Sequence, residues 1–207
     1  MTPFAYPKIK HVRTESPQQW RDYRRYKRVL QREFTRQCVY CRRPDVFSEA
    51  AFGVDHYKPK SRFPTLVGTY ANLFYCCSAC NSHKREFWPE AEELENGYFV
   101  PNPCDHAMFS HLRYHGSTVA RKTNAGQCAI EVLDLNDETE IQFRKTILRV
   151  IDSLIRSRKQ IAETLREIDR RLTAGPPEEK ALRRRRDGHQ QELDEIKQLL
   201  RELGADA

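Results

Sequence analysis

Four cysteines in two pairs are the residues whose spacing points most clearly to chemistry. Cys38 and Cys41 form one Cys-x-x-Cys pair, and Cys77 and Cys80 form a second. On a tight turn, such a pair can direct both thiolates at one ion, and two pairs complete the tetrahedron that Zn²⁺ prefers. The alternative, four ordinary buried thiols, is disfavoured because both pairs fall in one short segment. The spacing therefore predicts a structural zinc site.

Three further cysteines lie outside this frame. Cys76 adjoins a predicted ligand, but Cys77 keeps the Cys-x-x-Cys register with Cys80, and strand alternation would point Cys76 away from the zinc. Cys104 and Cys128 are interpreted as packing residues. One alternative stays open here, a second zinc site made by Cys104, His106 and His111.

Polar residues of another kind are held between and just after the pairs. Asp55-His56 and Asn72 lie between them, and Asn81 directly follows the last cysteine. Hydrolysis of a phosphodiester needs an activated water and a cation on the phosphate oxygens. A neutral histidine can accept the proton near pH 7, and Asp and Asn oxygens are hard ligands that suit Mg²⁺. The order of these residues within the cysteine frame indicates a phosphodiester-hydrolysing site.

This segment resembles the HNH endonucleases, whose core is the ββα-metal motif. Six elements carry the resemblance, in order: Cys38-x-x-Cys41, Val54-Asp55-His56-x-x-Pro59-x-Ser61, Asn72-Leu73, Cys77-x-x-Cys80, Asn81 and Lys84. The resemblance implies that His56 is the general base and that Asp55 and Asn81 bind a catalytic Mg²⁺ or Mn²⁺. It also implies that Asn72 orients the loop or the base, and that Lys84 lies near the phosphate or steadies the helix. Asn81 stands at the last position of the family's name, where Asn is a common variant.

A looser similarity extends over residues 38–155. It is carried by Tyr57-Lys58-Pro59-Lys60-Ser61, Tyr70-Ala71-Asn72-Leu73, a hairpin around Gly116 and Ile130–Asn136 before a long helix. These features are similar to the HNH effectors of bacterial anti-phage systems of the Septu and retron-associated type. That similarity implies a DNA substrate and an ATPase partner protein. With it we predict nucleic-acid contacts for Lys58, Lys60 and Lys84, and no catalytic role for His83.

The elements that must position these residues indicate an α+β chain in three parts. Residues 1–36 are expected to form an extended arm and a basic helix over Gln18–Arg36, which either presents a solvated face or contacts phosphates. Residues 37–135 would hold the nuclease core, with the four-cysteine zinc site and the ββα motif. Its expected pieces are a strand at Phe52–His56, a loop at Tyr57–Thr69, a helix from Asn81 and a hairpin around His115-Gly116.

Residues 136–207 show a helical period. Apolar residues recur at alternating three- and four-residue steps on both sides of Gly175-Pro176-Pro177, which predicts an antiparallel helical hairpin with coiled-coil character. Asn136 is the expected N-terminal cap. The run Arg183–Arg186 is interpreted as a solvated face. Hairpins of this kind commonly dimerise or dock on a partner, so a homodimer is one expectation.

Bulk composition narrows the function classes. The chain has 207 residues and a formal net charge of +7, which favours an anionic partner such as nucleic acid. Seven cysteines, an odd number, and the absence of an apolar signal segment or membrane span predict a cytoplasmic protein with metal-binding rather than disulfide-bonded cysteines. The leading hypothesis is a metal-dependent DNA endonuclease. The alternatives are a non-catalytic zinc-stabilised nucleic-acid-binding module and a scaffold with a vestigial core.

Overall fold

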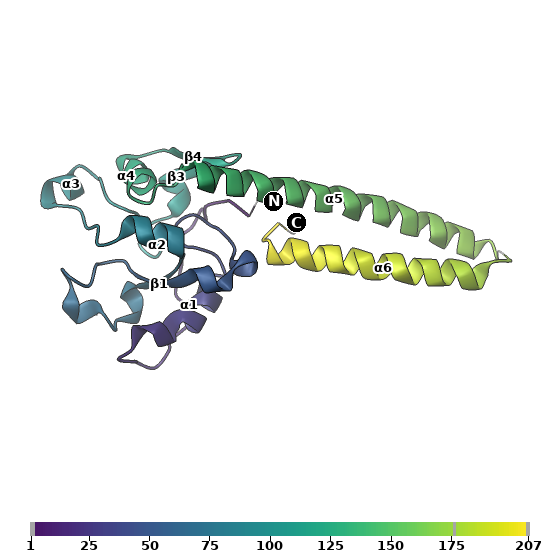
Figure 1. Ribbon diagram of the computed structural model, residues 1–207, viewed down its shortest axis with the longest axis horizontal. Coiled ribbons are helices and arrows are strands. Elements are labelled where there is room, and N and C mark those ends of the chain that lie inside the picture. The colour runs from purple at the N-terminus through teal and green to yellow at the C-terminus, as the bar shows by residue number, and fades with distance from the viewer. Residues whose placement is uncertain (1–2, 176, 206–207) are drawn as a thin grey trace. The chain divides into compact units, whose positions relative to one another are not determined.

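The computed structural model describes residues 3–175 and 177–205, which fall into two compact units (Figure 1). Residues 3–145 form the unit that contains every predicted site residue, and residues 146–205 belong to the other. Pro176 of the predicted Gly-Pro-Pro turn lies outside the described residues. Within the described ranges, no helix combines the length and the apolar character that a membrane crossing requires. The predicted α+β class is confirmed.

The site-bearing unit is built around a two-stranded sheet followed by a helix. Strand β1 (Phe52–His56) pairs antiparallel with β2 (Leu73–Cys77), and helix α2 (Ser78–Lys84) follows at once. The register places Asp55 opposite Phe74 and His56 opposite Leu73. All five residues of β2 are buried, as expected for a strand covered on both faces. The predicted strand at Phe52–His56 is confirmed.

The basic N-terminal helix is shorter than its sequence pattern predicts. In place of one helix over Gln18–Arg36, a 3-10 turn at Tyr23–Tyr26 leads into α1 (Lys27–Glu33). The side chain of Asp22 accepts a hydrogen bond from the Arg24 amide and caps the turn, so regular structure begins there. Two consecutive residues with left-handed backbone, φ 52° and 57°, end the helix: Thr35 and Arg36.

The segments between these elements contain short helical pieces. The loop predicted after β1 is confirmed as irregular apart from one 3-10 turn. The short pieces of this unit are η2 (Asp45–Phe47), η3 (Glu49–Ala51), η4 (Pro64–Leu66), η5 (Tyr70–Asn72), α3 (Ala91–Glu95) and η6 (Met108–Ser110).

The predicted hairpin is confirmed and is followed by an additional helix. Strands β3 (Leu112–His115) and β4 (Thr118–Arg121) pair antiparallel around Gly116, whose φ of 57° is the left-handed conformation that glycine adopts readily. Helix α4 (Asn124–Val132) comes next, in a segment for which the sequence did not predict a helix. Gly126 lets α4 approach closely, because a Cβ there would lie 2.0 Å from the carbonyl oxygen of His111.

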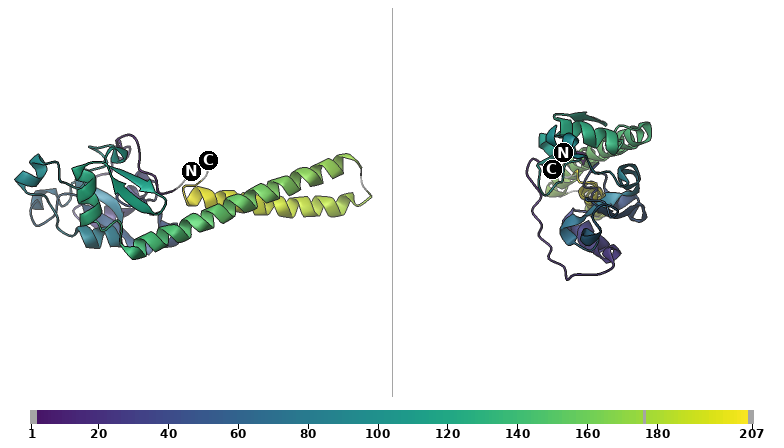
Figure 2. Two further views of the ribbon diagram at one scale, coloured as in Figure 1. Left: turned by 90° about the horizontal axis from the view of Figure 1, so that it is seen from above. Right: turned by 90° about the vertical axis from the view of Figure 1, so that its left-hand side faces the viewer.

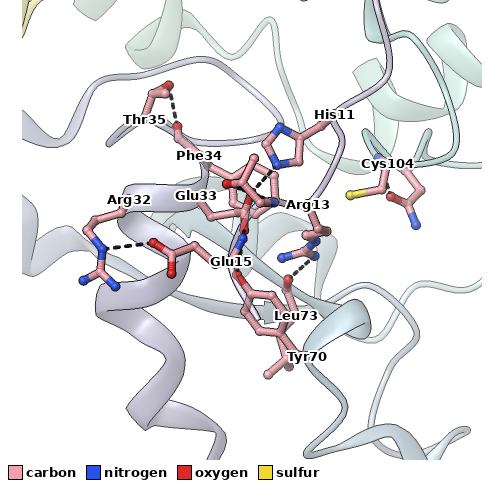
Figure 3. Close-up of polar contacts among 12 residues, drawn as sticks. His11, Arg13, Glu15, Arg32, Glu33, Phe34, Thr35, Tyr70, Leu73 and Cys104 are labelled. Carbon is pink, nitrogen blue, oxygen red and sulfur yellow. Dashed lines mark hydrogen bonds and ion pairs between the residues drawn. The ribbon is translucent and has the colours of Figure 1, made fainter. Parts of the chain in front are cut away.

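The N-terminal arm is fastened to α1 through the buried carboxylate of Glu33 (Figure 3). Glu33 accepts hydrogen bonds from the backbone amides of Thr14 and Glu15, from His11 and from the Tyr70 hydroxyl. Burial by itself would raise the pKa of Glu33, but these donors outweigh it and lower the pKa to about 2. The arm is therefore an ordered part of the core.

The second unit is a pair of long helices that run side by side in opposite directions (Figures 1 and 2). Helix α5 (Glu138–Thr173) starts in the site-bearing unit, and α6 (Glu179–Glu202) returns along it, with an ion pair between Arg186 and Asp169 at 2.6 Å. The predicted apolar seam is buried at Ile147, Ile151, Ile161, Leu165, Ile168, Leu182, Leu193, Ile196, Leu200 and Leu203. These contacts confirm the helical hairpin.

The cap of α5 is one residue later than predicted. Asn136 does not cap the helix, because its side chain is bonded to both the amide and the carbonyl of Val119 in β4. The carboxylate of Asp137 instead accepts bonds from the amides of Thr139, at 2.8 Å, and Glu140. Asn136 therefore ties the hairpin to the start of the helix.

Candidate active site

The four predicted cysteines converge into one buried cluster. Their sulfur atoms all lie within 4.8 Å of one another, and the Cys41 and Cys77 sulfurs are 3.6 Å apart. A tetrahedron with Zn–S bonds of about 2.3 Å has sulfur–sulfur edges near this distance. Cys38 and Cys41 come from the knuckle before β1, whereas Cys77 ends β2 and Cys80 lies in α2. The donor set and its geometry fit a structural zinc ion.

The remaining cysteines stay outside this cluster. Cys76 is buried but does not join the four ligands, in agreement with strand alternation. Cys128 is fully buried in the hydrophobic core and Cys104 packs against its edge. Among residues 3–175 and 177–205, no second group of metal-ligating side chains forms, so the open alternative of a zinc site at Cys104, His106 and His111 is not supported.

His56 is held with one defined ring nitrogen available for proton transfer. At the end of β1, its Nε2 lies 3.0 Å from the carbonyl oxygen of Val67, in the loop that returns to β2. Because a carbonyl can only accept, Nε2 must carry the hydrogen, and Nδ1 is left as the unprotonated nitrogen of a neutral ring. The ring of Tyr23 packs edge-on against His56 at 4.5 Å between centroids. Burial lowers the pKa of His56, which favours the neutral base.

Asp55 is anchored beside this histidine by two buried partners. The Tyr40 hydroxyl donates to Asp55 Oδ2 at 2.6 Å, and the Lys84 ammonium lies 3.2 Å from both Oδ1 and Oδ2. Lys84 also donates to the His56 carbonyl oxygen at 2.8 Å. A carboxylate offers about four lone-pair directions, so these bonds leave about one for a metal ion. Asp55 is therefore compatible with one coordination bond into the cleft that it lines.

Asn72 fixes the loop that supplies the partner of His56. Its side-chain oxygen accepts from the Lys58 amide at 2.8 Å, and its amide group donates to the Lys58 carbonyl at 3.1 Å and to the Leu66 carbonyl at 3.4 Å. Leu66 is the neighbour of Val67, whose carbonyl holds the histidine. Of the two roles that the resemblance implies, the contacts therefore favour orientation of the loop.

Asn81 completes the site from the opposite side. It lies in α2, immediately after the ligand Cys80, and its side chain is exposed. Together with Asp55 and His56 it lines a cleft of about 250 Å³, which also reaches Lys60. The amide oxygen of Asn81 and the carboxylate of Asp55 are hard donors, so the residues that face this cleft fit a divalent cation such as Mg²⁺.

The three lysines predicted to contact nucleic acid have different surroundings. Lys60 lines the cleft, with its ammonium 5.5 Å from the Tyr23 ring centre, as a phosphate contact would require. Lys58 lies against the rings of Phe63 and Trp88. The Lys84 side chain is only 1% exposed, so this arrangement does not support a direct contact between Lys84 and phosphate. Its bonds to Asp55 and His56 instead favour the second role that the resemblance implies for Lys84, which is to hold the helix in place.

Sequence reasoning missed three residues at the cleft: Tyr23, Arg85 and Glu86. Tyr23 comes from the 3-10 turn before α1, far from the motif in sequence, and only its aromatic character within a basic segment could have drawn attention to it. Arg85 follows α2 with a left-handed φ of 48°, which turns the chain at the rim of the cleft. No pattern of residue spacing in the sequence predicts that Tyr23 or Arg85 lies at the cleft.

Comparisons with known proteins agree with this geometry. The HNH endonuclease family model matches residues 38–87, the segment that holds the cysteine cluster, β1, β2 and α2. The Septu protein PtuB of Bacillus thuringiensis is 26% identical over 113 residues, which make up 54% of this chain and 41% of that relative. The matched part thus spans about two fifths of the relative's length. No solved structure matches the chain. Residues 38–87 of this protein are therefore similar to HNH endonuclease domains.

Proposed function

We propose that this protein is a metal-dependent endonuclease that hydrolyses phosphodiester bonds of DNA. One observation carries the proposal: His56 has its Nε2 engaged by Val67 and its Nδ1 available, in the same cleft as Asp55 and Asn81. A base and two hard oxygen donors facing one small cleft are what phosphodiester hydrolysis requires. The net charge of +7 supports an anionic polymer as substrate.

In the proposed mechanism, His56 Nδ1 removes the proton from a water molecule as that water attacks phosphorus. The bond from phosphorus to the leaving sugar oxygen breaks, and that oxygen takes up a proton from solvent. Asp55 and Asn81 would hold Mg²⁺ or Mn²⁺, which when bound neutralises charge on the phosphate oxygens. Lys84 and Tyr40 keep the Asp55 carboxylate in place through their buried bonds. The zinc cluster fixes Asn81 relative to His56, because Cys80 and Asn81 are adjacent in α2.

Plasmid cleavage tests this proposal. Purified protein with supercoiled plasmid and Mg²⁺ or Mn²⁺ should produce nicked circles, and His56→Ala should reduce the rate by at least about a hundredfold, the usual contribution of a general base. His83→Ala is the matched control, because this exposed histidine of α2 does not line the cleft. Cleavage that survives His56→Ala would refute the assignment of the base. Binding without cleavage under any metal would instead favour the non-catalytic zinc module or the scaffold.

We further propose that the nuclease serves in anti-phage defence beside an ATPase partner, by its likeness to the Septu protein PtuB. None of the seven cysteines is in a disulfide, which is in keeping with a cytoplasmic, reducing location. The helical hairpin offers a surface for a homodimer or for a partner, since a single HNH site cuts one strand at a time. Co-purification from the native host with and without residues 146–207 would identify such a partner.

A further inference from the structure

A second hollow lies directly beside the cleft of His56. It has a volume of about 300 Å³ and is lined by Tyr23, Arg24, Lys27, Gly53, Val54 and Asn81. Three of these residues, Tyr23, Val54 and Asn81, line the first cleft as well. The two spaces are therefore neighbours. Tyr23, which packs on His56, and Asn81, the candidate metal ligand, lie between them.

The two spaces differ in charge. The first cleft mixes cations and carboxylates, with Lys60 and Arg85 against Asp55 and Glu86, as expected where a metal ion and a phosphate meet. Of the described residues that line the second hollow, two are cationic and none is acidic. A site with only positive side chains and polar amides suits an anion without a metal ion.

The two cations of the second hollow keep their charge available. The Lys27 ammonium donates to the backbone carbonyl of Glu49 at 3.1 Å, a contact that orients the lysine without neutralising it. Arg24 lies 3.9 Å from the carboxylate of Asp22, but both side chains are more than half exposed, so this pair is weak and screened. Either cation can therefore form a stronger charge-assisted bond with a phosphate.

Gly53 forms the floor of the hollow and has no side chain to fill it. A Cβ built on Gly53 would meet no atom within 4 Å, so the space above this part of β1 is open. Gly53 lines only the second hollow, whereas Asp55 and His56, two and three residues later on the same strand, line the first. A nucleic-acid strand with its scissile phosphate at His56 would therefore run along β1 toward Arg24 and Lys27.

We propose that this second hollow binds the phosphate next to the scissile one on the same nucleic-acid strand, with Arg24 and Lys27 as its ligands. The proposal rests on the proposed nuclease function and adds a site that sets where the strand lies. It also decides between the two interpretations of the basic N-terminal segment: Arg24 and Lys27 contact phosphate, and Arg21 and Arg28, which are exposed and line neither space, form the solvated face.

Salt-dependent binding tests the site independently of cleavage. The full-length protein would be titrated against a short fluorescein-labelled DNA duplex and the matching single strand, without divalent cation, at several salt concentrations. Arg24→Gln and Lys27→Gln should each lower the slope of log affinity against log salt, and the double variant should lower it by about 0.7–0.9, the value for one phosphate contact. Arg28→Gln, the matched control, should leave the slope unchanged. Equal losses in all three variants, or no loss in the first two, would overturn the proposal.

A steric variant tests the position of the site. Gly53→Glu places a bulky negative group in open space, so the fold should persist, and affinity should fall about tenfold or more, as expected when a charge-assisted contact is lost. Gly53→Ala, which adds only a Cβ, should bind nearly as the wild type does. Unchanged binding by Gly53→Glu, with an unchanged melting temperature, would show that no phosphate occupies the hollow.

Neutral phosphate substitution gives the final test where wild-type cleavage is observed. Single methylphosphonates would replace each phosphate around the cut position of an oligonucleotide. One adjacent substitution should slow cleavage by the wild type, and the same substitution should cause no further loss in the double variant Arg24→Gln/Lys27→Gln, since both changes remove the contacts of one phosphate. Additive losses would overturn the assignment. A wild type that binds but never cleaves would contradict the nuclease function, and the salt and Gly53 results would then still decide the binding site.

Discussion

At the scale of single residues, the buried bonds around Asp55 explain why Lys84 is part of the motif. Its ammonium is enclosed and divided between the Asp55 carboxylate and the His56 carbonyl, so it supports both neighbours at once. A buried ion pair contributes modest net stability compared with an apolar pair, but removal of one partner is costly because the other charge stays buried. Tyr40 cannot replace Lys84, because it offers a neutral hydrogen bond only.

Lys84→Met should therefore destabilise the fold strongly. We expect a loss of about 3–5 kcal/mol in the free energy of unfolding, because Asp55 is left without a counter-charge in the interior. Urea denaturation followed by tryptophan fluorescence measures this loss. His83→Met, at an exposed position of the same helix, should change stability by less than about 0.5 kcal/mol. Equal stability of Lys84→Met and wild type would show that the pair is not formed.

The environment of His56 also sets the expected pH profile. Burial lowers the pKa of this histidine, so the base stays unprotonated to a more acidic pH than a solvated histidine would. Activity should hold steady through neutral pH and fall only as the pH drops through the lowered pKa, below the ordinary value of about 6.5. Tyr23→Ala should raise that pKa toward the ordinary value by exposing the ring, and so shift the acid limb of the cleavage rate upward. An identical acid limb in both proteins would contradict the role of Tyr23.

At the scale of elements, one zinc ion would join the first knuckle to β2 and α2, which follow directly on each other later in the chain. The first knuckle, the end of β2 and the first turn of α2 each contribute to the cysteine cluster. The sheet itself has only two strands of five residues each, which alone are marginal in water. Metal binding and folding should therefore be coupled in this unit.

Loss of zinc should unfold the site-bearing unit. Cys77→Ser, or treatment with a strong chelator, should abolish the cooperative melting transition of this unit and release its buried tyrosines to solvent. His56→Ala should lower the melting temperature only in part and keep the transition cooperative, so the two variants separate folding from catalysis. The helical signal of α5 and α6 in circular dichroism should largely persist, because their seam is buried within the hairpin. Normal folding of Cys77→Ser would disprove the zinc assignment.

The sequence allowed the local elements to be predicted where one dominant pattern controlled them. The spacing of the cysteines predicted the two knuckles, and strand alternation predicted β1. The heptad pattern of apolar residues predicted the hairpin of α5 and α6. The basic helix was overestimated because its periodicity does not register the cap at Asp22 or the left-handed residues after it. Tyr23 could not be assigned to the site from the sequence, because its contact with His56 depends on tertiary packing between distant segments. The cap of α5 was misplaced because Asn136 is used in a bond to β4 that no local rule contains.

At the scale of the whole molecule, the chain joins the site-bearing unit to a helical unit with its own apolar seam. Among the described residues of that helical unit, two large apolar side chains are exposed outside the seam: Val150 at 42% and Leu199 at 45%. Antiparallel helical hairpins with outward apolar positions are suited to four-helix association. We therefore propose the hairpin as the surface of a homodimer, which would bring two nicking sites to one duplex.

Leu199→Glu tests the dimer. If two hairpins associate through this face, light scattering coupled to size exclusion should show a dimer for the wild type and a monomer for the variant, because a buried unpaired charge is costly. Lys180→Glu, at an exposed position of the same helix that does not line the groove of Leu199, is the control and should not change the mass. Double-strand breaks in plasmid should decrease relative to nicks in Leu199→Glu. A monomeric wild type would refute this assembly.

The packing of the N-terminal arm has a consequence for synthesis on the ribosome. Tyr6 stacks on Tyr114, and the Tyr114 hydroxyl donates to the carbonyl of Cys41, 73 positions earlier in the chain. The first knuckle is therefore translated long before the residue that closes over it emerges from the exit tunnel. A nascent chain arrested before Tyr114 should hold its metal in an open, exchangeable site, vulnerable to thiol oxidation. Completion of β3 would then cover the cysteine cluster, so the timing of translation should decide when a bound zinc ion becomes protected from loss.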